Sequence, residues 1–295
     1  MPLRATLLLA MLFAWVGNSA RAGSATNITG LYYTGNTSSG TLAAGGTTDG
    51  NWSVTYARVN GTQYTGSSTY TGAAYVLSSN YIDAAYVANT SNAQWITAPG
   101  ASTSSSGGST NQGGDYLPGN GTSGTNSAYY VYRLAFTVTG TGSGTVTNNI
   151  QISMTIAADD SYTVYVNPAS SPTVNNFGTI SAGGTTASAS GTSAWNNTTS
   201  FTLGNSTLNG GTNNSTFVIG TNYIYVVVAN TNSQTGSSGS NALNPSGLLV
   251  YQVGSGVTID GKPIPEAGTF LPLLAAVGLY GWRRLRRRSD PVPLA

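Results

Sequence analysis

The chain contains short stretches in which hydrophobic and polar residues alternate with a period of two. From Tyr130 to Val138 every even position is aromatic or aliphatic, and from Ile150 to Ile156 the even positions are apolar while the odd ones are polar. Successive side chains of a β-strand point to opposite faces of a sheet. This spacing therefore predicts two strands, each with one buried side.

The alternation continues after a cluster of turn-forming residues, Asp159, Asp160 and Ser161. We expect Tyr162–Val166 to be the next strand and to form a β-hairpin with Ile150–Ile156. Further strands are predicted at Trp52–Val59, Ala74–Val76, Phe201–Leu203, Tyr223–Val228 and Leu248–Val253. Many short strands without helical spacing predict an all-β fold, a jelly-roll-type β-sandwich.

Three segments between the strands consist almost only of Gly, Ser, Thr and Asn: Gly100–Ser127, Ser181–Thr199 and Thr231–Asn241. We predict that they are long structureless loops at the ends of the sandwich. The 18 tyrosines and five tryptophans argue against a disordered low-complexity chain. The strands on both sides of each loop are needed to close one sheet, so residues 23–260 are predicted to form a single domain.

The first 22 residues have the three parts of a secretory signal peptide. Arg4 supplies a positive start, Ala5–Val16 is apolar but too short to span a membrane, and Ala20-Arg21-Ala22 is a small-x-small cleavage site. We predict that signal peptidase cleaves after Ala22 and that the mature chain begins near Gly23.

The last 35 residues, 261–295, contain a second export-related pattern. A motif at 265–269 (Pro265, Glu266, Ala267, Gly268 and Thr269) overlaps an uncharged apolar segment, 267–282, and an arginine-rich tail at 283–288 follows. The arginines of that tail are Arg283, Arg284, Arg286, Arg287 and Arg288. As a helix the apolar segment would reach about 24 Å, slightly short of a hydrocarbon core of about 30 Å. The arginines would stop it on the cytoplasmic side and leave the preceding chain across the membrane. Length alone leaves a short permanent anchor open.

The order of motif, short apolar helix and arginine cluster resembles the PEP-CTERM sorting signal of Gram-negative bacteria. The resemblance implies export across the inner membrane, a transient anchor in that membrane, and processing at the motif by exosortase. Ala267 stands where proline is the commonest residue of the family motif.

The charge between the two ends limits the functions that the domain can have. From Gly23 to Ile264 the chain carries six aspartates, three cations (Arg58, Arg133 and Lys262), no histidine and no cysteine. A net charge of −3 removes the electrostatic basis for binding nucleic acid. A serine nucleophile would lack its histidine base, and no two aspartates stand out as the facing carboxylates of a glycosidase. We therefore expect a protein that is not an enzyme and that folds without disulfides.

A second resemblance covers most of the domain, from Leu31 to Val253. It is carried by these short motifs: Asp49-Gly50-Asn51-Trp52, Trp95-Ile96, Tyr132-Arg133-Leu134-Ala135-Phe136, Ala157-Ala158-Asp159-Asp160, Tyr165-Val166-Asn167, Val228-Ala229-Asn230 and Asn244-Pro245-Ser246-Gly247-Leu248. Their succession is similar to domains that precede such sorting tails and that resemble the galactose-binding-like β-sandwiches of carbohydrate-binding modules. The resemblance implies a fold more directly than it implies a ligand.

Asp159 and Asp160 have two interpretations. Carboxylates in turns commonly cap backbone N–H groups, which is the interpretation that we favour. Alternatively, the two carboxylates and nearby carbonyl groups would supply the hard oxygen ligands of a structural Ca²⁺ site, the one cofactor that we consider.

Aromatic side chains are the remaining candidates for ligand contact, because they can stack on sugar rings. We consider Trp52, Trp95 and Trp195 first, and Tyr129 and Tyr130 after them. Trp52 and Trp95 lie in patterned segments, which favours a place in the core. Trp195 lies in a polar segment beside Asn196 and Asn197, and is either an exposed contact or a plug over one end of the sandwich.

Two classes of function follow from these patterns. The first is an exported cell-surface or extracellular matrix protein of a biofilm, sorted by exosortase, that binds carbohydrate in the exopolysaccharide. The second is a structural coat protein whose nearly uncharged surface associates with further copies of itself.

Overall fold

The computed structural model describes residues 22–59, 62–66, 70–77, 86–99, 128–175, 178–183, 186–192, 195–205, 215–230, 246–251 and 256–264. The predicted signal peptide up to residue 21, the sorting signal at 265–295 and the loops 100–127 and 231–241 lie outside the described residues. Within the described part the regular elements are all β-strands, which confirms the all-β class.

The strands are β1 (Ser24–Thr29), β2 (Thr48–Val59), β3 (Thr62–Thr65), β4 (Gly72–Val76), β5 (Ile96–Thr97), β6 (Ala128–Thr141), β7 (Ile150–Ala158), β8 (Ser161–Val166), β9 (Thr173–Val174), β10 (Ile180–Ser181), β11 (Ala189–Thr192), β12 (Thr199–Gly204), β13 (Gly220–Asn230), β14 (Leu248–Tyr251), β15 (Val257–Ile259) and β16 (Lys262–Pro263). All the strands predicted from alternation are present, with bounds that differ by a few residues.

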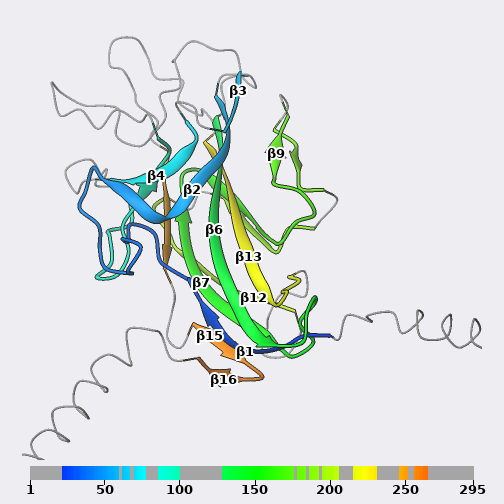
Figure 1. The fold of residues 1–295 in the computed structure, drawn as a ribbon. Helices are drawn as coiled ribbons and strands as arrows, with labels where there is room; N and C mark the ends of the chain where they lie inside the picture. Colours follow the sequence, from blue (N-terminus) through cyan, green and yellow to red (C-terminus); the bar gives the residue numbers. More distant parts are fainter. Residues whose placement is uncertain are drawn as a thin grey trace, which may run out of the picture.

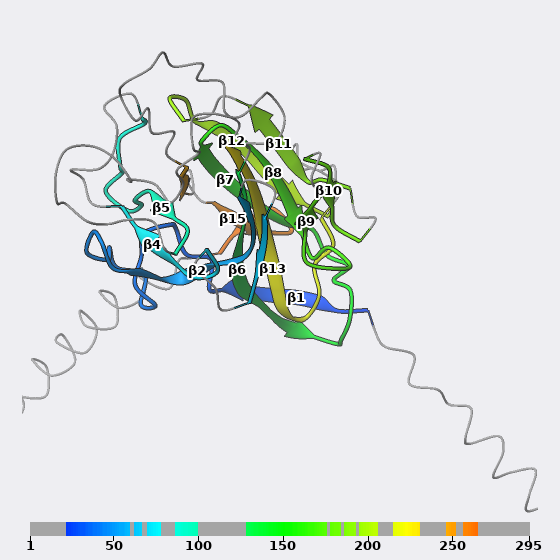
Figure 2. The ribbon, with the colours of Figure 1, turned by 90° about the horizontal axis from the view of Figure 1, so that it is seen from above.

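Most of the strands belong to one antiparallel sheet that curls round on itself (Figures 1 and 2). Its order runs β11-β8-β13-β6-β2-β4-β5-β14-β7. Ile152 of β7 pairs with Leu203 of β12 and also with Val257 of β15, so β12 and β15 lie on opposite edges of β7. β12, which pairs with β7, also contacts β11 at the other end of this order. The sheet therefore encloses a core between two walls, an arrangement consistent with a β-sandwich.

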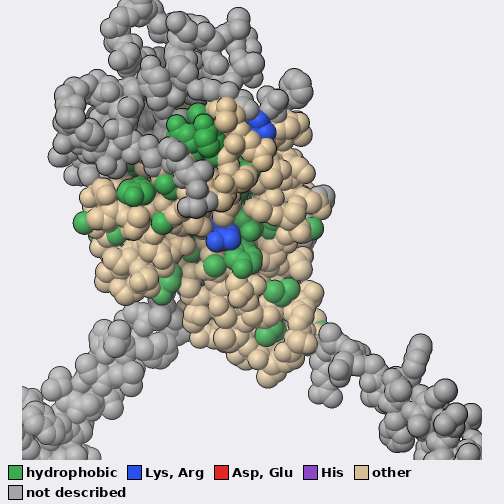
Figure 3. Space-filling model, turned by 45° about the horizontal axis from the view of Figure 1, so that its top comes forward, with side chains coloured by type: hydrophobic (Ala, Val, Ile, Leu, Met, Phe, Trp, Pro, Cys, Tyr) green, Lys and Arg blue, Asp and Glu red, His purple; other side chains and the backbone are tan. Residues whose placement is uncertain are grey.

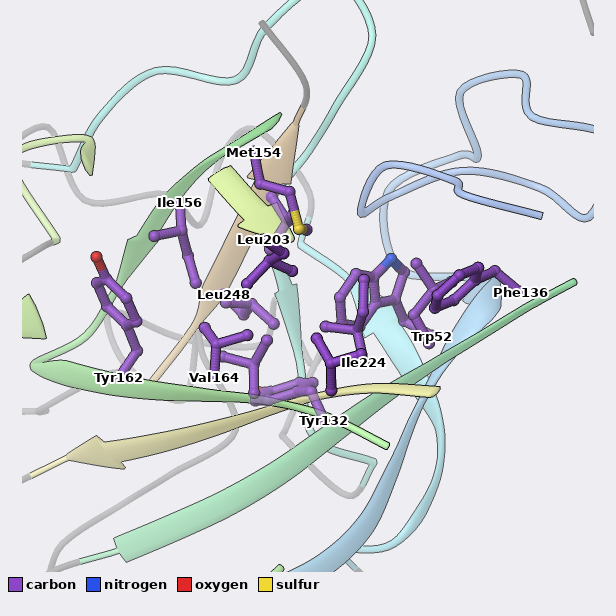
Figure 4. Close-up of a cluster of buried hydrophobic side chains, with 14 of the residues drawn as sticks. Trp52, Tyr132, Phe136, Met154, Ile156, Tyr162, Val164, Leu203, Ile224 and Leu248 are labelled. Carbon is purple, nitrogen blue, oxygen red and sulfur yellow. The ribbon is translucent and has the colours of Figure 1, made fainter. Parts of the chain in front are cut away.

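The core includes the side chains that the alternation assigned to the buried faces. Tyr132, Leu134 and Phe136 of β6 are at most 2% exposed, and Ile152 and Ile156 of β7 are fully buried. Figure 4 shows side chains from the two walls pointing toward one another. Burying each large apolar side chain contributes about 1.5–3 kcal/mol, so this continuous cluster is the main source of stability in a domain without disulfides.

The predicted hairpin between β7 and β8 is wrong. β7 pairs with β12, β14 and β15, whereas β8 pairs with β11 and β13. Ile156 of β7 and Val164 of β8 face each other across the core (Figure 4). Alternation identifies the buried face of a strand but not its partner, and Asp159-Asp160 is a corner that takes the chain from one wall to the other.

The prediction of a structureless loop at Ser181–Thr199 is also wrong in part, because this segment contains β11. Ala189–Thr192 pairs with Thr163 and its neighbours in β8 through backbone hydrogen bonds, which do not require β-forming side chains. A Cβ atom at Gly191 would come within 2.7 Å of the Tyr162 ring. The absence of a side chain at Gly191 therefore allows β11 to approach the aromatic edge of the core.

A small hairpin, β9–β10, covers part of the outer face of the sheet. The Tyr56 hydroxyl donates to the Val174 carbonyl at 2.6 Å, and Arg58 Nε donates to the same oxygen at 2.7 Å. Val174 packs with Val131 and Tyr225 in a second apolar cluster. The sheet thus has an inner core and a smaller outer one.

Candidate functional site

Asp159 and Asp160 lie at the corner between β7 and β8, and the backbone holds this corner on both sides. The Asp159 N–H donates to the Gly247 carbonyl at 3.1 Å, and the Asp160 N–H donates to the Ala229 carbonyl at 2.8 Å. The peptide bond between the two aspartates is cis. Asp159 is 4% exposed, and Asp160 is half-buried. The corner therefore has a defined place at the ends of β13 and β14.

Tyr86 connects this corner to two of the tryptophans that the sequence singles out. Its hydroxyl donates to Asp159 Oδ2. Its ring centroid lies 4.7 Å from that of Trp95 and 6.1 Å from that of Trp195. From the sequence, Asp159, Trp95 and Trp195 were separate candidates, and the structure brings them together. Tyr86 was not predicted, because it lies outside the alternating stretches and carries no local signal.

Trp95 forms the floor of this cluster. It is fully buried, its indole Nε1 donates to the Val87 carbonyl at 2.7 Å, and its backbone N–H donates to Asn89 Oδ1 at 3.0 Å. A Cβ atom at Gly247 would lie 2.9 Å from its ring, so the backbone just before β14 packs directly against the indole. Trp95 is therefore a support and not a ligand contact.

Trp52 lies apart from this cluster, in the inner core. Its side chain is 1% exposed, and its Nε1 donates to the Tyr32 carbonyl at 3.1 Å. Tyr130 is fully buried. Burial excludes Trp52, Trp95 and Tyr130 from direct contact with a ligand and confirms the core interpretation of the two tryptophans.

Trp195 is the tryptophan of the three that retains exposed surface. It is half-buried, and the next two residues, Asn196 and Asn197, are exposed. The Val87 N–H donates to the Trp195 carbonyl at 3.0 Å, which fixes the backbone of Trp195 beside Tyr86. A half-buried indole whose backbone is held in place is suited to stacking against an apolar ligand face.

The corner also gathers oxygen atoms of the kind that Ca²⁺ prefers. The side chains of Asn230 and Ser246 are buried beside the corner. Asn230 follows Ala229, and Ser246 precedes Gly247, the two residues whose carbonyl groups accept the N–H groups of the corner. The buried Ser246 hydroxyl has no hydrogen-bond partner among the residues that the structure describes. Carboxylate, amide and hydroxyl oxygens fit a hard cation. Nevertheless, the described residues contain no group of three acidic side chains placed to hold a metal ion.

Comparison with known protein families, curated proteins and solved structures gives no match for this chain. Among the residues that the structure describes, none belong to a helix long and apolar enough to cross a membrane. The functional interpretation therefore depends on the geometry of the site and on the sequence patterns.

Proposed function

We propose that this chain is an exported surface or biofilm-matrix protein that binds carbohydrate at the cluster of Asp159, Tyr86 and Trp195. The single observation that carries the proposal is the convergence of a half-exposed indole and a buried carboxylate on one tyrosine. We further propose that the curled sheet is a jelly-roll sandwich of the galactose-binding-like type.

The chemistry of the cluster suits a sugar ring. An indole face offers an apolar platform for the C–H groups of a pyranose, and carboxylate oxygens accept hydrogen bonds from its hydroxyl groups. Asp160, which is half-buried, would provide the acceptor nearest to solvent. A Ca²⁺ ion held by Asp159 and Asp160 would add a Lewis-acidic contact for vicinal hydroxyl groups.

The orientation of the site is consistent with display on a surface. Ile150–Ile152 of β7 pairs with β15, whereas Ala157 and Ala158 at the other end of β7 pair with β14 beside the corner. The nine residues of β7 span about 30 Å at roughly 3.4 Å each. Figure 1 shows β1, β15 and β16 together at the end of the sheet remote from that corner. A chain tethered through the residues after β16 would thus present the site outward.

A glycan array tests the proposal with purified wild-type protein and the variants Trp195→Ala and Leu42→Ala. Leu42 is an exposed apolar residue outside the cluster and serves as the control. We expect Trp195→Ala to lower affinity by about tenfold or more, because aromatic anchors dominate binding, and Leu42→Ala to bind as the wild type does.

The same array with a chelator tests the metal. Loss of binding on chelation, restored by added Ca²⁺, would support a Ca²⁺ site at Asp159 and Asp160. Binding and a melting temperature that do not change on chelation would contradict such a site. Absence of glycan binding by the wild type would contradict the proposed function. Concentration-dependent assembly without any glycan would then favour the alternative, a self-associating coat protein whose low charge opposes contact only weakly.

A further inference from the structure

The outer face of the sheet carries a second feature, apart from the corner and beside the apolar cluster that Val174 of β9 forms with Val131 and Tyr225. Arg133 of β6 points to this face and pairs in register with Tyr225 of β13 on one side and Ser53 of β2 on the other. Tyr223 is the next residue of β13 on the same face. These residues lie on three adjacent strands in the middle of the sheet, where β6 is hydrogen-bonded to β13 on one side and to β2 on the other.

Arg133 is held against the sheet by an aromatic ring. Its Cζ lies 5.5 Å from the centroid of the Tyr223 ring, and the Tyr223 and Tyr225 ring centroids are 6.1 Å apart. Arginine stacks on aromatic faces without using its N–H groups. Tyr223 therefore orders the guanidinium while leaving its donors available.

Those donors make no hydrogen bond or ion pair to the residues that the structure describes. Arg58, on the same side of the sheet, differs in this respect: its guanidinium donates to the Val174 carbonyl at 2.7 Å and to Gln63 Oε1 at 3.2 Å. Arg58 thus has a structural role that Arg133 lacks, although both are half-buried.

No described carboxylate neutralises the charge of Arg133. Asp49 is buried and accepts backbone N–H groups, Asp159 and Asp160 form the corner, and Asp260 lies in the turn between β15 and β16. In the view of Figure 3, the basic side chains lie among hydrophobic and neutral polar ones, and no acidic side chain is visible. The face is a cationic spot in a domain whose net charge is otherwise negative.

We propose that Arg133, held in place by the Tyr223 ring, binds the carboxylate groups of an acidic, uronate-containing polysaccharide. The planar fork of arginine matches a carboxylate through two parallel N–H···O bonds. The part of this face that β9–β10 leaves uncovered accommodates a polymer running across the strands, and the half-buried Tyr223 ring offers apolar contact to its sugar rings. The proposal rests on the proposed function only for the ligand being a glycan, because it concerns a different face.

Binding of wild-type protein to polygalacturonate, measured by biolayer interferometry, tests this site. We expect Arg133→Gln to lower the affinity by about tenfold or more, because a bidentate charge-assisted pair is lost. Arg133→Lys keeps the positive charge but not the planar fork, so its affinity should lie between those of the wild type and Arg133→Gln. The wild-type affinity should decrease between 50 and 200 mM salt, roughly in proportion to the ion pairs formed.

Two further ligands define the chemistry. Methyl-esterified polygalacturonate has no free carboxylate and should not bind, whereas dextran sulfate should bind weakly and without dependence on Arg133. Trp195→Ala should bind polygalacturonate as the wild type does. This variant therefore separates a failure of the site proposed at the Asp159 corner from a failure of the site proposed at Arg133. Equal melting temperatures would show that the variants are folded.

Several outcomes would overturn the proposal. They are equal affinity of Arg133→Gln and wild type, equal affinity of Arg133→Lys and wild type, and binding of the methyl ester. Dextran sulfate binding that depends on Arg133 as strongly as polygalacturonate binding does would overturn the assignment to carboxylate.

Discussion

Asp49 shows how one buried carboxylate organises a long loop. It is 3% exposed, and its two oxygens accept the backbone N–H groups of Gly35 at 2.6 Å, Asn51 at 2.7 Å and Trp52 at 2.8 Å. These bonds join the segment before β2 to the start of that strand and place the Trp52 indole in the core. Burial raises the pKa of Asp49, although the backbone hydrogen bonds act in the opposite direction.

The raised pKa has a consequence for stability that Asp49→Asn tests. Because the folded-state pKa exceeds the ordinary value of 3.8, the neutral carboxyl favours folding. Its contribution is present below pH 3.8 and is lost as the pH rises through the folded-state pKa. The unfolding free energy of the wild type should therefore decrease relative to Asp49→Asn as the pH rises from 3 through the acid range.

Urea unfolding at several pH values measures this difference. The variant itself should be about 1–3 kcal/mol less stable at pH 3, because its amide nitrogen cannot accept an N–H group. Asp260→Asn, in an exposed turn, is the control variant. A difference between wild type and Asp49→Asn that stays constant with pH would contradict the argument.

At the scale of the elements, alternation over five or more residues predicted strands well, but their partners lay beyond its reach. The buried face of β6 follows from its own sequence. β7 was predicted to have one buried side but is buried on both faces, because Ala157 packs with Trp95 and Leu249 on the second face. The pairing of Tyr162 and its neighbours depends on β13, which is some 60 residues away. Two-residue strands such as β5 and β16 are too short to show a period. The residues of the candidate site were predicted one by one and not as a cluster, because their contacts also join distant parts of the chain. Tyr86 gains its role only through its contacts with Asp159 and Trp195.

Gly191→Ala tests the contact that allows β11 to pair. The added methyl group would meet the Tyr162 ring at 2.7 Å. That ring is 2% exposed and stacks on Phe201 with centroids 6.3 Å apart, so it has little room to move. We expect a loss of about 1–3 kcal/mol in unfolding free energy, the usual cost of overpacking. Ser190→Ala, at an exposed position of the same strand, should change stability by less than about 0.5 kcal/mol. Equal stability of the two variants would show that the contact is unimportant.

At the scale of the whole molecule, the two proposed binding sites lie away from the end of the sheet through which the domain would be tethered. The Asp159 corner and the outer face near Arg133 both lie away from β16, the last strand that the structure describes. A single curled sheet makes this separation possible, because strands as long as β6 and β13 run from one end of the core to the other. A domain of this kind can be held at one end without covering either site.

Mass spectrometry of the protein from native cells tests the proposed export and processing. We expect an N-terminus near Gly23, because signal peptidase would remove the leader, and a C-terminus near Pro265, because exosortase would act at the motif. Glu266→Ala should leave the arginine cluster attached if the motif is recognised, while Asp260→Asn, just upstream, should be processed normally. An intact arginine cluster on the wild-type protein would instead support a short permanent anchor, for which an apolar segment of about 24 Å is marginal. Recovery of the full-length chain from the cytosol, with its leader attached, would contradict export itself and with it the surface role proposed for both sites.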